Sequence, residues 1–175
     1  MTCRELIIQA EAQNRELLER GKAAAARLDD EAWNRAPEKG WSPAQVFEHL
    51  ILSNQDHLAI VSERLASAPK GGDASAHHTF FGRIIMKSAS PEGKGPVPKP
   101  FVPRPGPYTR EVLDRWVAQQ EQIIALHDRA KDVDLTAVRY PVPLLKLFKM
   151  SLCDIFAIFA THTERHIRQI EERAK

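Results

Sequence analysis

The sequence predicts an all-α protein: a four-helix bundle whose helices run up, down, down and up. Three observations lead to this fold class. Four segments repeat apolar residues with a helical period, no segment shows the alternation of a β-strand, and one long proline-rich segment separates the second helix from the third. The 175 residues suit a single domain over residues 1–175 that can bury a core.

The first predicted helix covers about residues 2–28, and residues 29–40 form a connection. Asn34, Pro37 and Gly40 break the helical pattern there. The apolar positions of this helix lie opposite a charged face, as in an amphipathic helix that packs on a core. These positions are Leu6, Ile7, Ala10, Leu17, Leu18, Gly21, Ala24, Ala25 and Leu28.

The second predicted helix begins at Ser42 and ends near Ala66. Its start combines an N-cap serine, a proline at the first helical position and a glutamine placed for a capping box. A polar stripe lies within one face, with a spacing of three or four residues: Gln45, His49, Ser53 and Asp56. Polar side chains inside a bundle need partners, so this stripe is the first candidate for a site.

Residues 67–108 form the proline-rich segment, which we interpret as a crossover and lid and not as a second domain. Seven of the twelve prolines lie between Pro91 and Pro107, which excludes one regular helix. The residues from Phe80 to Lys87 are expected to form a short helix across the bundle.

The third predicted helix covers about residues 109–130, a short connection follows over residues 132–143, and the fourth helix begins after Ser151. Ser151 and Asp154 have the spacing of a capping box. The inward face of the fourth helix starts apolar, with Ile155 and Ile158, and ends polar.

His162 and His166 are one helical turn apart on the fourth helix, a spacing that can bind one metal ion. Alone, the pair also fits a solvated surface or capping of the helix C-terminus. His49 is the predicted third ligand, because it lies roughly 9 Å beyond the start of its helix and the pair roughly 10 to 16 Å before the end of theirs. Antiparallel packing of these two helices brings all three to one level, and the connection lengths predict that packing independently.

Three neutral imidazoles with an open position suit a divalent metal ion, with zinc or nickel favoured and iron as a further option. A catalytic metal uses its open position either to ionise water near neutral pH or to bind a thiol as thiolate. The sequence leaves both chemistries open.

Outer hydrogen bonds to the ligand histidines are expected from Gln169, one turn after His166, and with less support from Asp56, which also fits a core or surface polar residue. Glu164 and Arg165 flank the ligands, where they can touch a substrate or form surface ion pairs, and the sequence does not decide between these roles.

The other histidines are not predicted ligands. His57 is expected to be exposed, away from the face of His49, and His127 to be a hydrogen-bonded histidine near one end of the bundle. The adjacent His77 and His78 are expected to be solvated in a polar loop.

Composition narrows the classes of partner. The formal net charge of +2 gives no global attraction to nucleic acid or anionic membrane. The N-terminus becomes polar too early for a signal peptide, and the most apolar run, residues 152–160, is too short to span a membrane. Two cysteines distant in sequence indicate reduced thiols. We expect a cytoplasmic protein with a small-molecule substrate, no nucleic acid, no membrane contact and a homodimer as one state of assembly.

Two stretches resemble the DinB-like family, also called YfiT-like metal-dependent enzymes. They are residues 41–50, WSPAQVFEHL, and residues 162–170, HTERHIRQI, and the resemblance covers essentially the whole chain. It implies a DinB-like up-down-down-up bundle over residues 1–175 and a divalent nickel or zinc ion bound by His49, His162 and His166.

The resemblance also implies a reaction class. Characterised relatives include transferases and isomerases that use low-molecular-weight thiols such as bacillithiol or mycothiol, so S-transfer to a small electrophile is the expected chemistry. Hydrolysis and a non-catalytic metal-binding bundle remain as alternatives. The catalytic group is expected to be metal-bound water or thiolate, and no thiol-recognition signature is present.

Overall fold

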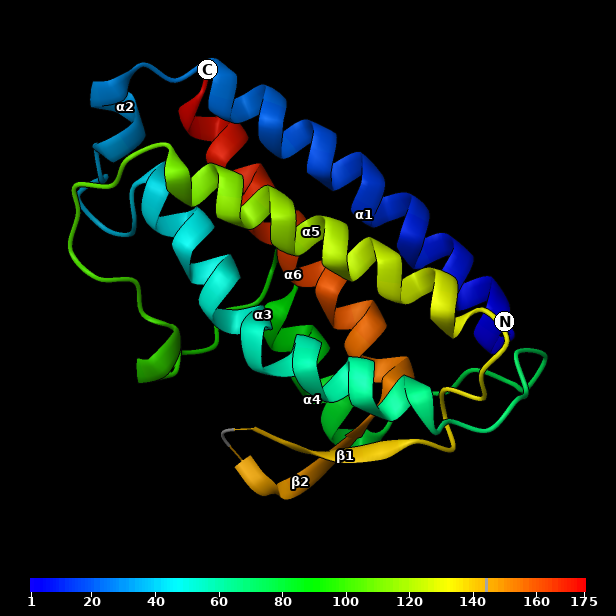
Figure 1. Ribbon diagram of the computed structural model, residues 1–175. Helices are drawn as coiled ribbons and strands as arrows, with labels where there is room; N and C mark the ends of the chain where they lie inside the picture. Colours follow the sequence, from blue (N-terminus) through cyan, green and yellow to red (C-terminus); the bar gives the residue numbers. More distant parts are fainter. Residues whose placement is uncertain (144) are drawn as a thin grey trace.

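The computed structural model describes residues 1–143 and 145–175, and these are mostly helical, as predicted (Figure 1). Four long helices dominate the molecule: α1 (Cys3–Ala26), α3 (Pro43–Ala66), α5 (Glu111–Ala130) and α6 (Leu152–Arg173). The shorter elements are α2 (Asp30–Asn34), α4 (Phe80–Ala89), the 3-10 helix η1 (Lys99–Phe101) and the strands β1 (Arg139–Val142) and β2 (Leu145–Ser151).

The long helices pack so that α1 and α3 each contact both α5 and α6. In Figure 1, α1 and α6 run in one direction and α3 and α5 in the other. The helix that carries His49 and the helix that carries His162 and His166 are therefore antiparallel neighbours. This is the packing that the candidate site requires.

Three of the long helices begin at capping boxes that the local sequence encodes. Thr2, Ser42 and Ser151 each accept a hydrogen bond from the backbone three residues later, and the side chain at that later position bonds back. These bonds satisfy backbone donors that a helix start leaves free. The starts predicted at Ser42 and Ser151 are confirmed, and so is the short helix inside the crossover.

The sequence-based expectation of no strands is wrong, because β1 and β2 form an antiparallel hairpin before α6. Buried Tyr140 lies opposite buried Met150, so one face of the hairpin packs on the core. A four-residue strand that contains Pro141 is too short to give a clear period, and its stability comes from packing against the helices. The helix α2, within the predicted connection 29–40, was also missed.

The core has two clusters of apolar side chains, one at each end of the long helices. The first includes Phe156 and Tyr140 beside the hairpin, and the second includes Phe47 and Trp116 near α2. Trp116 lies directly against Gly21 of α1, where any side chain would collide with the indole ring. The close approach of α5 to α1 thus depends on that glycine.

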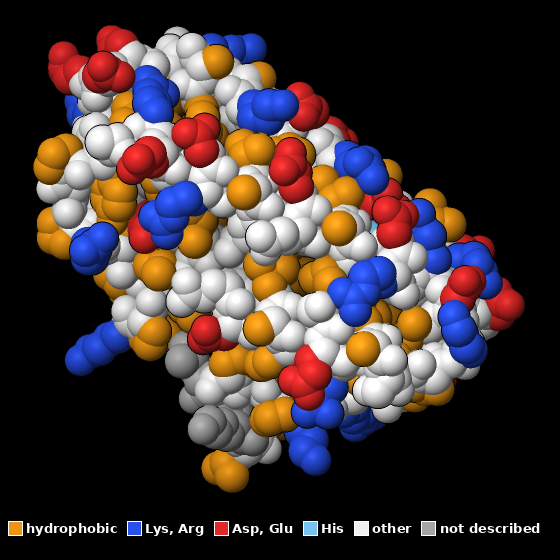
Figure 2. Space-filling view, viewed as in Figure 1, with side chains coloured by type: hydrophobic (Ala, Val, Ile, Leu, Met, Phe, Trp, Pro, Cys, Tyr) orange, Lys and Arg blue, Asp and Glu red, His pale blue; other side chains and the backbone are white. Residues whose placement is uncertain are grey.

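The surface carries mixed charge. Figure 2 shows basic and acidic side chains interspersed over the face formed by α1, α3 and α5, in keeping with the small net charge. Among the helices that the structure describes, none combines the length and apolarity needed to cross a lipid bilayer.

Candidate metal centre

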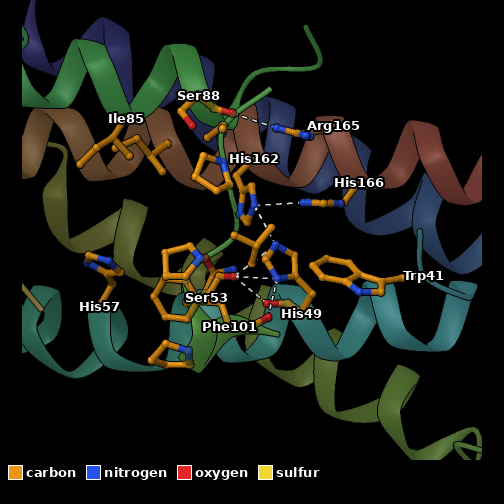
Figure 3. Close-up of a pocket in the computed structure, with 18 of the residues that line it drawn as sticks. Trp41, His49, Ser53, His57, Ile85, Ser88, Phe101, His162, Arg165 and His166 are labelled. Carbon is orange, nitrogen blue, oxygen red and sulfur yellow. Dashed lines mark hydrogen bonds between the residues drawn. The ribbon is translucent and has the colours of Figure 1, made fainter. Parts of the chain in front are cut away.

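The structure brings His49, His162 and His166 together between α3 and α6, and we call them the three-histidine cluster (Figure 3). The Nε2 atom of His162 lies 3.2 Å from Nε2 of His49 and 3.0 Å from Nε2 of His166. Within the described part of the chain, this is the group of metal-binding side chains close enough to share an ion.

The outward nitrogens of two of these rings are held by acceptors. His49 Nδ1 donates to the main-chain oxygen of Phe101 at 2.8 Å, and His166 Nδ1 donates to Oε1 of Gln169 at 2.9 Å. An imidazole that donates from Nδ1 carries its proton there when neutral, so the Nε2 atoms of both rings present lone pairs. These lone pairs point towards His162.

This arrangement leaves an electrostatic conflict that a cation resolves. If His162 Nε2 carries a proton, it can donate a hydrogen bond to the Nε2 lone pair of either His49 or His166. The lone pair of the remaining ring then has no hydrogen-bond donor. A tetrahedral zinc ion with Zn–N bonds of about 2.0–2.1 Å holds its nitrogens about 3.3 Å apart. The two spacings to His162, 3.2 and 3.0 Å, are close to that value, and the ligand atoms of all three rings lie within 4.8 Å of one another, so the donor set fits a divalent metal.

The three rings are neutral at physiological pH. Burial lowers the pKa of His49 to about 4, although the Phe101 carbonyl opposes the shift. Burial also lowers the pKa of His162 to about 3 and holds the pKa of His166 well below its ordinary value, and the neighbouring positive charges add to both effects. Neutral imidazole is the form that binds a metal, so little competition from protons is expected near pH 7.

A cavity of about 920 Å³ opens onto the three-histidine cluster. Its walls come from α3 and α6, from α4, from the hairpin and from the proline-rich crossover, which contributes Pro96, Pro98 and Pro100. The crossover thus covers the cavity as well as holding His49 through Phe101. A volume of this size accommodates a small organic molecule beside a metal ion.

The comparison with family models identifies a match to the DinB superfamily over residues 13–170. The chain belongs to the DinB superfamily. No match was found among curated proteins or among solved structures.

Of the two residues predicted to hydrogen-bond to the ligand histidines of this DinB-superfamily chain, Gln169 does so and Asp56 does not among the described residues. Gln169 holds His166, as described above. Asp56 is exposed and makes no hydrogen bond to the three-histidine cluster among the described residues, since it lies nearly two turns beyond His49 on α3. The acceptor for His49 is instead a main-chain carbonyl from the crossover, which no side-chain pattern reveals.

The expectation that His57 is exposed is wrong. This side chain is partly buried, lines the same cavity and contacts the hydroxyl of Tyr140 at 3.2 Å. Burial lowers the pKa of His57 to about 4. The helix face of His57 looked unpartnered in sequence because the hairpin that covers it was not predicted.

The remaining histidines have structural contacts. His127 is buried and contacts the Ile123 carbonyl at 2.7 Å, while its Nε2 has no hydrogen-bond partner among the described residues. His77 is exposed, as expected, but His78 is partly buried and contacts Asp154 at 3.2 Å. The expectation that both loop histidines are solvated therefore holds for one of them.

The two charged residues between the ligands point in different directions. Glu164 turns towards α1 and pairs with Arg20 and Arg168. Arg165 lines the cavity and donates to the Ser88 carbonyl at 2.8 Å, which ties the end of α4 to α6 (Figure 3).

Two cavity residues were missed from the sequence. Trp41 packs its ring on His49 with centroids 4.7 Å apart, and Arg173 lines the cavity near the end of α6. Arg173 follows His166 by seven residues, a spacing that keeps it on the same helix face. Extending the histidine face towards the C-terminus would have identified it.

Proposed function

We propose that this protein is a metal-dependent enzyme in which His49, His162 and His166 bind one divalent ion. The proposal includes the up-down-down-up bundle as the scaffold, with α1, α3, α5 and α6 as its four helices. One observation carries it: three neutral imidazoles direct their Nε2 atoms at one another on the wall of a cavity of about 920 Å³. Zinc or nickel suits this donor set, and iron is a further option.

The residues around the ion would prepare it for reaction. Phe101 and Gln169 fix the ring orientation of His49 and His166, which supports metal affinity. The crossover and α4 form part of the cavity wall around the ion. A bound divalent ion would act as a Lewis acid that lowers the pKa of a thiol or water molecule in its open position.

S-transfer from a thiol to a small electrophile is the reaction that this cavity supports best. Among its described lining residues there is no carboxylate side chain, so the general base that metal-dependent hydrolases commonly use is lacking. His57 lines the cavity, but a pKa of about 4 makes it a weak base. A thiol needs less assistance, because coordination alone is sufficient to deprotonate it.

A turnover assay tests the reaction class. Untagged protein loaded with zinc or nickel is incubated with a low-molecular-weight thiol and a panel of electrophiles, and thiol consumption is followed; a parallel panel contains esters. We expect metal-dependent thiol consumption that falls to background in His162→Ala and persists in His77→Ala, a change at an exposed histidine outside the cavity.

The alternatives give different results in the same assay. Ester cleavage without thiol consumption would indicate a hydrolase. Absence of turnover across both panels in metal-loaded protein would contradict the enzyme proposal and favour a metal-binding bundle without catalysis.

A further inference from the structure

The face of α6 that lines the cavity changes character along its length. Ile155 and Ile158 come first, His162 and His166 follow, and Arg173 comes last, all at spacings that keep them on one helix face. With a rise of about 1.5 Å per residue, Arg173 lies about 10 Å beyond His166 and Ile158 about 6 Å before His162. The cavity therefore has an apolar end, a metal-binding middle and a cationic end.

The cationic end contains Arg173, whose hydrogen-bonding capacity is not filled. Arg173 forms no ion pair among the described residues, and its Nη1 atom is buried without a hydrogen-bond partner. At the level of the three-histidine cluster, the Nε atom of Arg165 is also buried without a partner among the described residues. Burial lowers the pKa of Arg173, which reflects the cost of holding a poorly compensated charge.

Other arginines of the same helix bundle show what ordinary pairing looks like. Arg20 contacts Glu164 at 2.9 Å and Glu171 at 2.8 Å, and exposed Arg168 also pairs with Glu164. A basic residue in the last turn of a helix commonly serves the helix dipole from the solvent. Arg173 instead turns into a cavity and is half-buried there.

No acidic side chain balances this charge within the described cavity lining. The cavity is lined by three residues with cationic side chains, namely Arg165, Arg173 and the exposed Lys39. The opposite end is apolar, with walls formed by Ile84, Ile85, Val142, Met150, Ile155 and Ile158. A ligand that fits both ends carries a negative charge at one end and an apolar body at the other.

We infer that the cavity binds an organic oxyanion, with the anionic group at Arg173 and the apolar body between α4, the hairpin and the start of α6. The planar guanidinium group of Arg173 suits a carboxylate or phosphonate because it offers parallel N–H donors. The inference deepens the proposed function, since it assigns a substrate class to the same site and places the middle of the ligand beside the three-histidine cluster.

Binding to metal-free protein tests the inference without relying on the metal. Protein treated with a chelator is titrated calorimetrically with 8-phenyloctanoate, with 7-phenylheptylphosphonate and with the neutral isostere 8-phenyloctanamide, which are long enough to reach from Arg173 towards the apolar end. At least one anion should bind about tenfold or more tightly than the amide, as expected for a charged hydrogen bond. The tighter of the two anions identifies the preferred group, and equal affinity for both anions and the amide would overturn the inference.

Variants locate the binding. Arg173→Gln should weaken binding of the anion about tenfold and leave the amide unchanged, and Arg173→Lys should restore part of the anion affinity. Arg168→Gln, at the exposed arginine on another face of α6, is the matched control and should bind like the wild type. Circular dichroism checks that each variant is folded. Anion binding unchanged in folded Arg173→Gln would refute the assignment of the cationic end.

The same experiment separates this inference from the metal proposal. His162→Ala should lose metal yet bind the anion as well as the metal-free wild type does. If the wild-type protein binds the anion but binds no metal, the oxyanion site stands and the enzyme proposal is refuted. Metal binding without anion preference would do the reverse.

Discussion

Two buried polar regions at α6 differ in how completely their hydrogen-bond acceptors are satisfied. At the start of the helix, Asp154 is fully buried and accepts bonds from the backbone and hydroxyl of Thr79, from the backbone of Ser151 and from His78. We call these four residues the Asp154 cluster. Around the middle of α6, His162 and His166 meet His49 of α3, and the rings of this three-histidine cluster point nitrogen acceptors at one another.

This difference indicates that the Asp154 cluster stabilises the fold, whereas the three-histidine cluster is suited to binding a ligand. Every acceptor of the Asp154 cluster meets a donor, and the effect is to fasten the N-terminus of α4 to the N-terminus of α6. Gly82 allows this approach, because a side chain there would collide with the carboxylate. The three-histidine cluster is incomplete without a cation, and proteins keep such an arrangement buried chiefly where something binds.

The largest expected effect on folding comes from Asp154→Ala. Burial raises the pKa of this carboxyl, but the hydrogen bonds from His78, Ser151 and Thr79 outweigh it and hold the pKa below its ordinary value. Removing the carboxylate leaves several buried donors without an acceptor, at a cost of about 2–4 kcal/mol in the free energy of unfolding. Urea unfolding measures it.

A matched control for that change is Asp134→Ala. Asp134 also accepts hydrogen bonds from the backbone and hydroxyl of Thr136, but it lies in a partly exposed loop. We expect it to cost about 1 kcal/mol or less, because water replaces the lost acceptor. Equal losses for both variants would mean that the Asp154 cluster has no special role in holding α4.

The second largest expected effect is on metal affinity at the three-histidine cluster. Gln169→Leu removes the acceptor that orients His166, so metal affinity should fall about 10- to 100-fold. Gln169→Glu keeps an acceptor at the same position and should retain most of the affinity. Competition with a chromophoric chelator measures both, and an unchanged affinity in Gln169→Leu would show that the contact does not orient the ring.

A smaller effect concerns pH and His57. Its folded pKa of about 4 lies below the ordinary value of 6.5, so the unfolded chain binds the proton more readily between these values. Stability is therefore full above about pH 6.5 and falls as pH drops towards 4. At pH 5 the loss from this residue should be about 1–2 kcal/mol relative to pH 7.

The variant His57→Gln tests that assignment. It should show a smaller loss of unfolding free energy between pH 7 and pH 5 than the wild type, both measured without metal. A pH profile parallel to that of the wild type would contradict the shifted pKa of His57.

Helix starts were readable from sequence because capping is local. Ser42 and Ser151 lie within three residues of the groups that they bond, so short motifs predicted both starts. The meeting of His49 with His162 was also predictable, because helix rise and connection lengths determine depth along a bundle.

Contacts that depend on irregular backbone were not readable. The Phe101 carbonyl reaches His49 from a proline-rich segment without a period, and the hairpin that covers His57 includes a strand of four residues. Arg173 is a different case. Its position on the histidine face followed from helical spacing, but a basic residue near a helix end is ordinarily explained by the dipole.

The metal content of the untagged protein tests the central claim most directly. Chelator-treated protein is titrated with zinc or nickel by calorimetry, and bound metal is counted by mass spectrometry after desalting. We predict one ion per chain and a loss of affinity of at least about 100-fold in His49→Ala, His162→Ala and His166→Ala, with His57→Ala unchanged. Substoichiometric metal in the wild type, or equal binding in all four variants, would contradict the account.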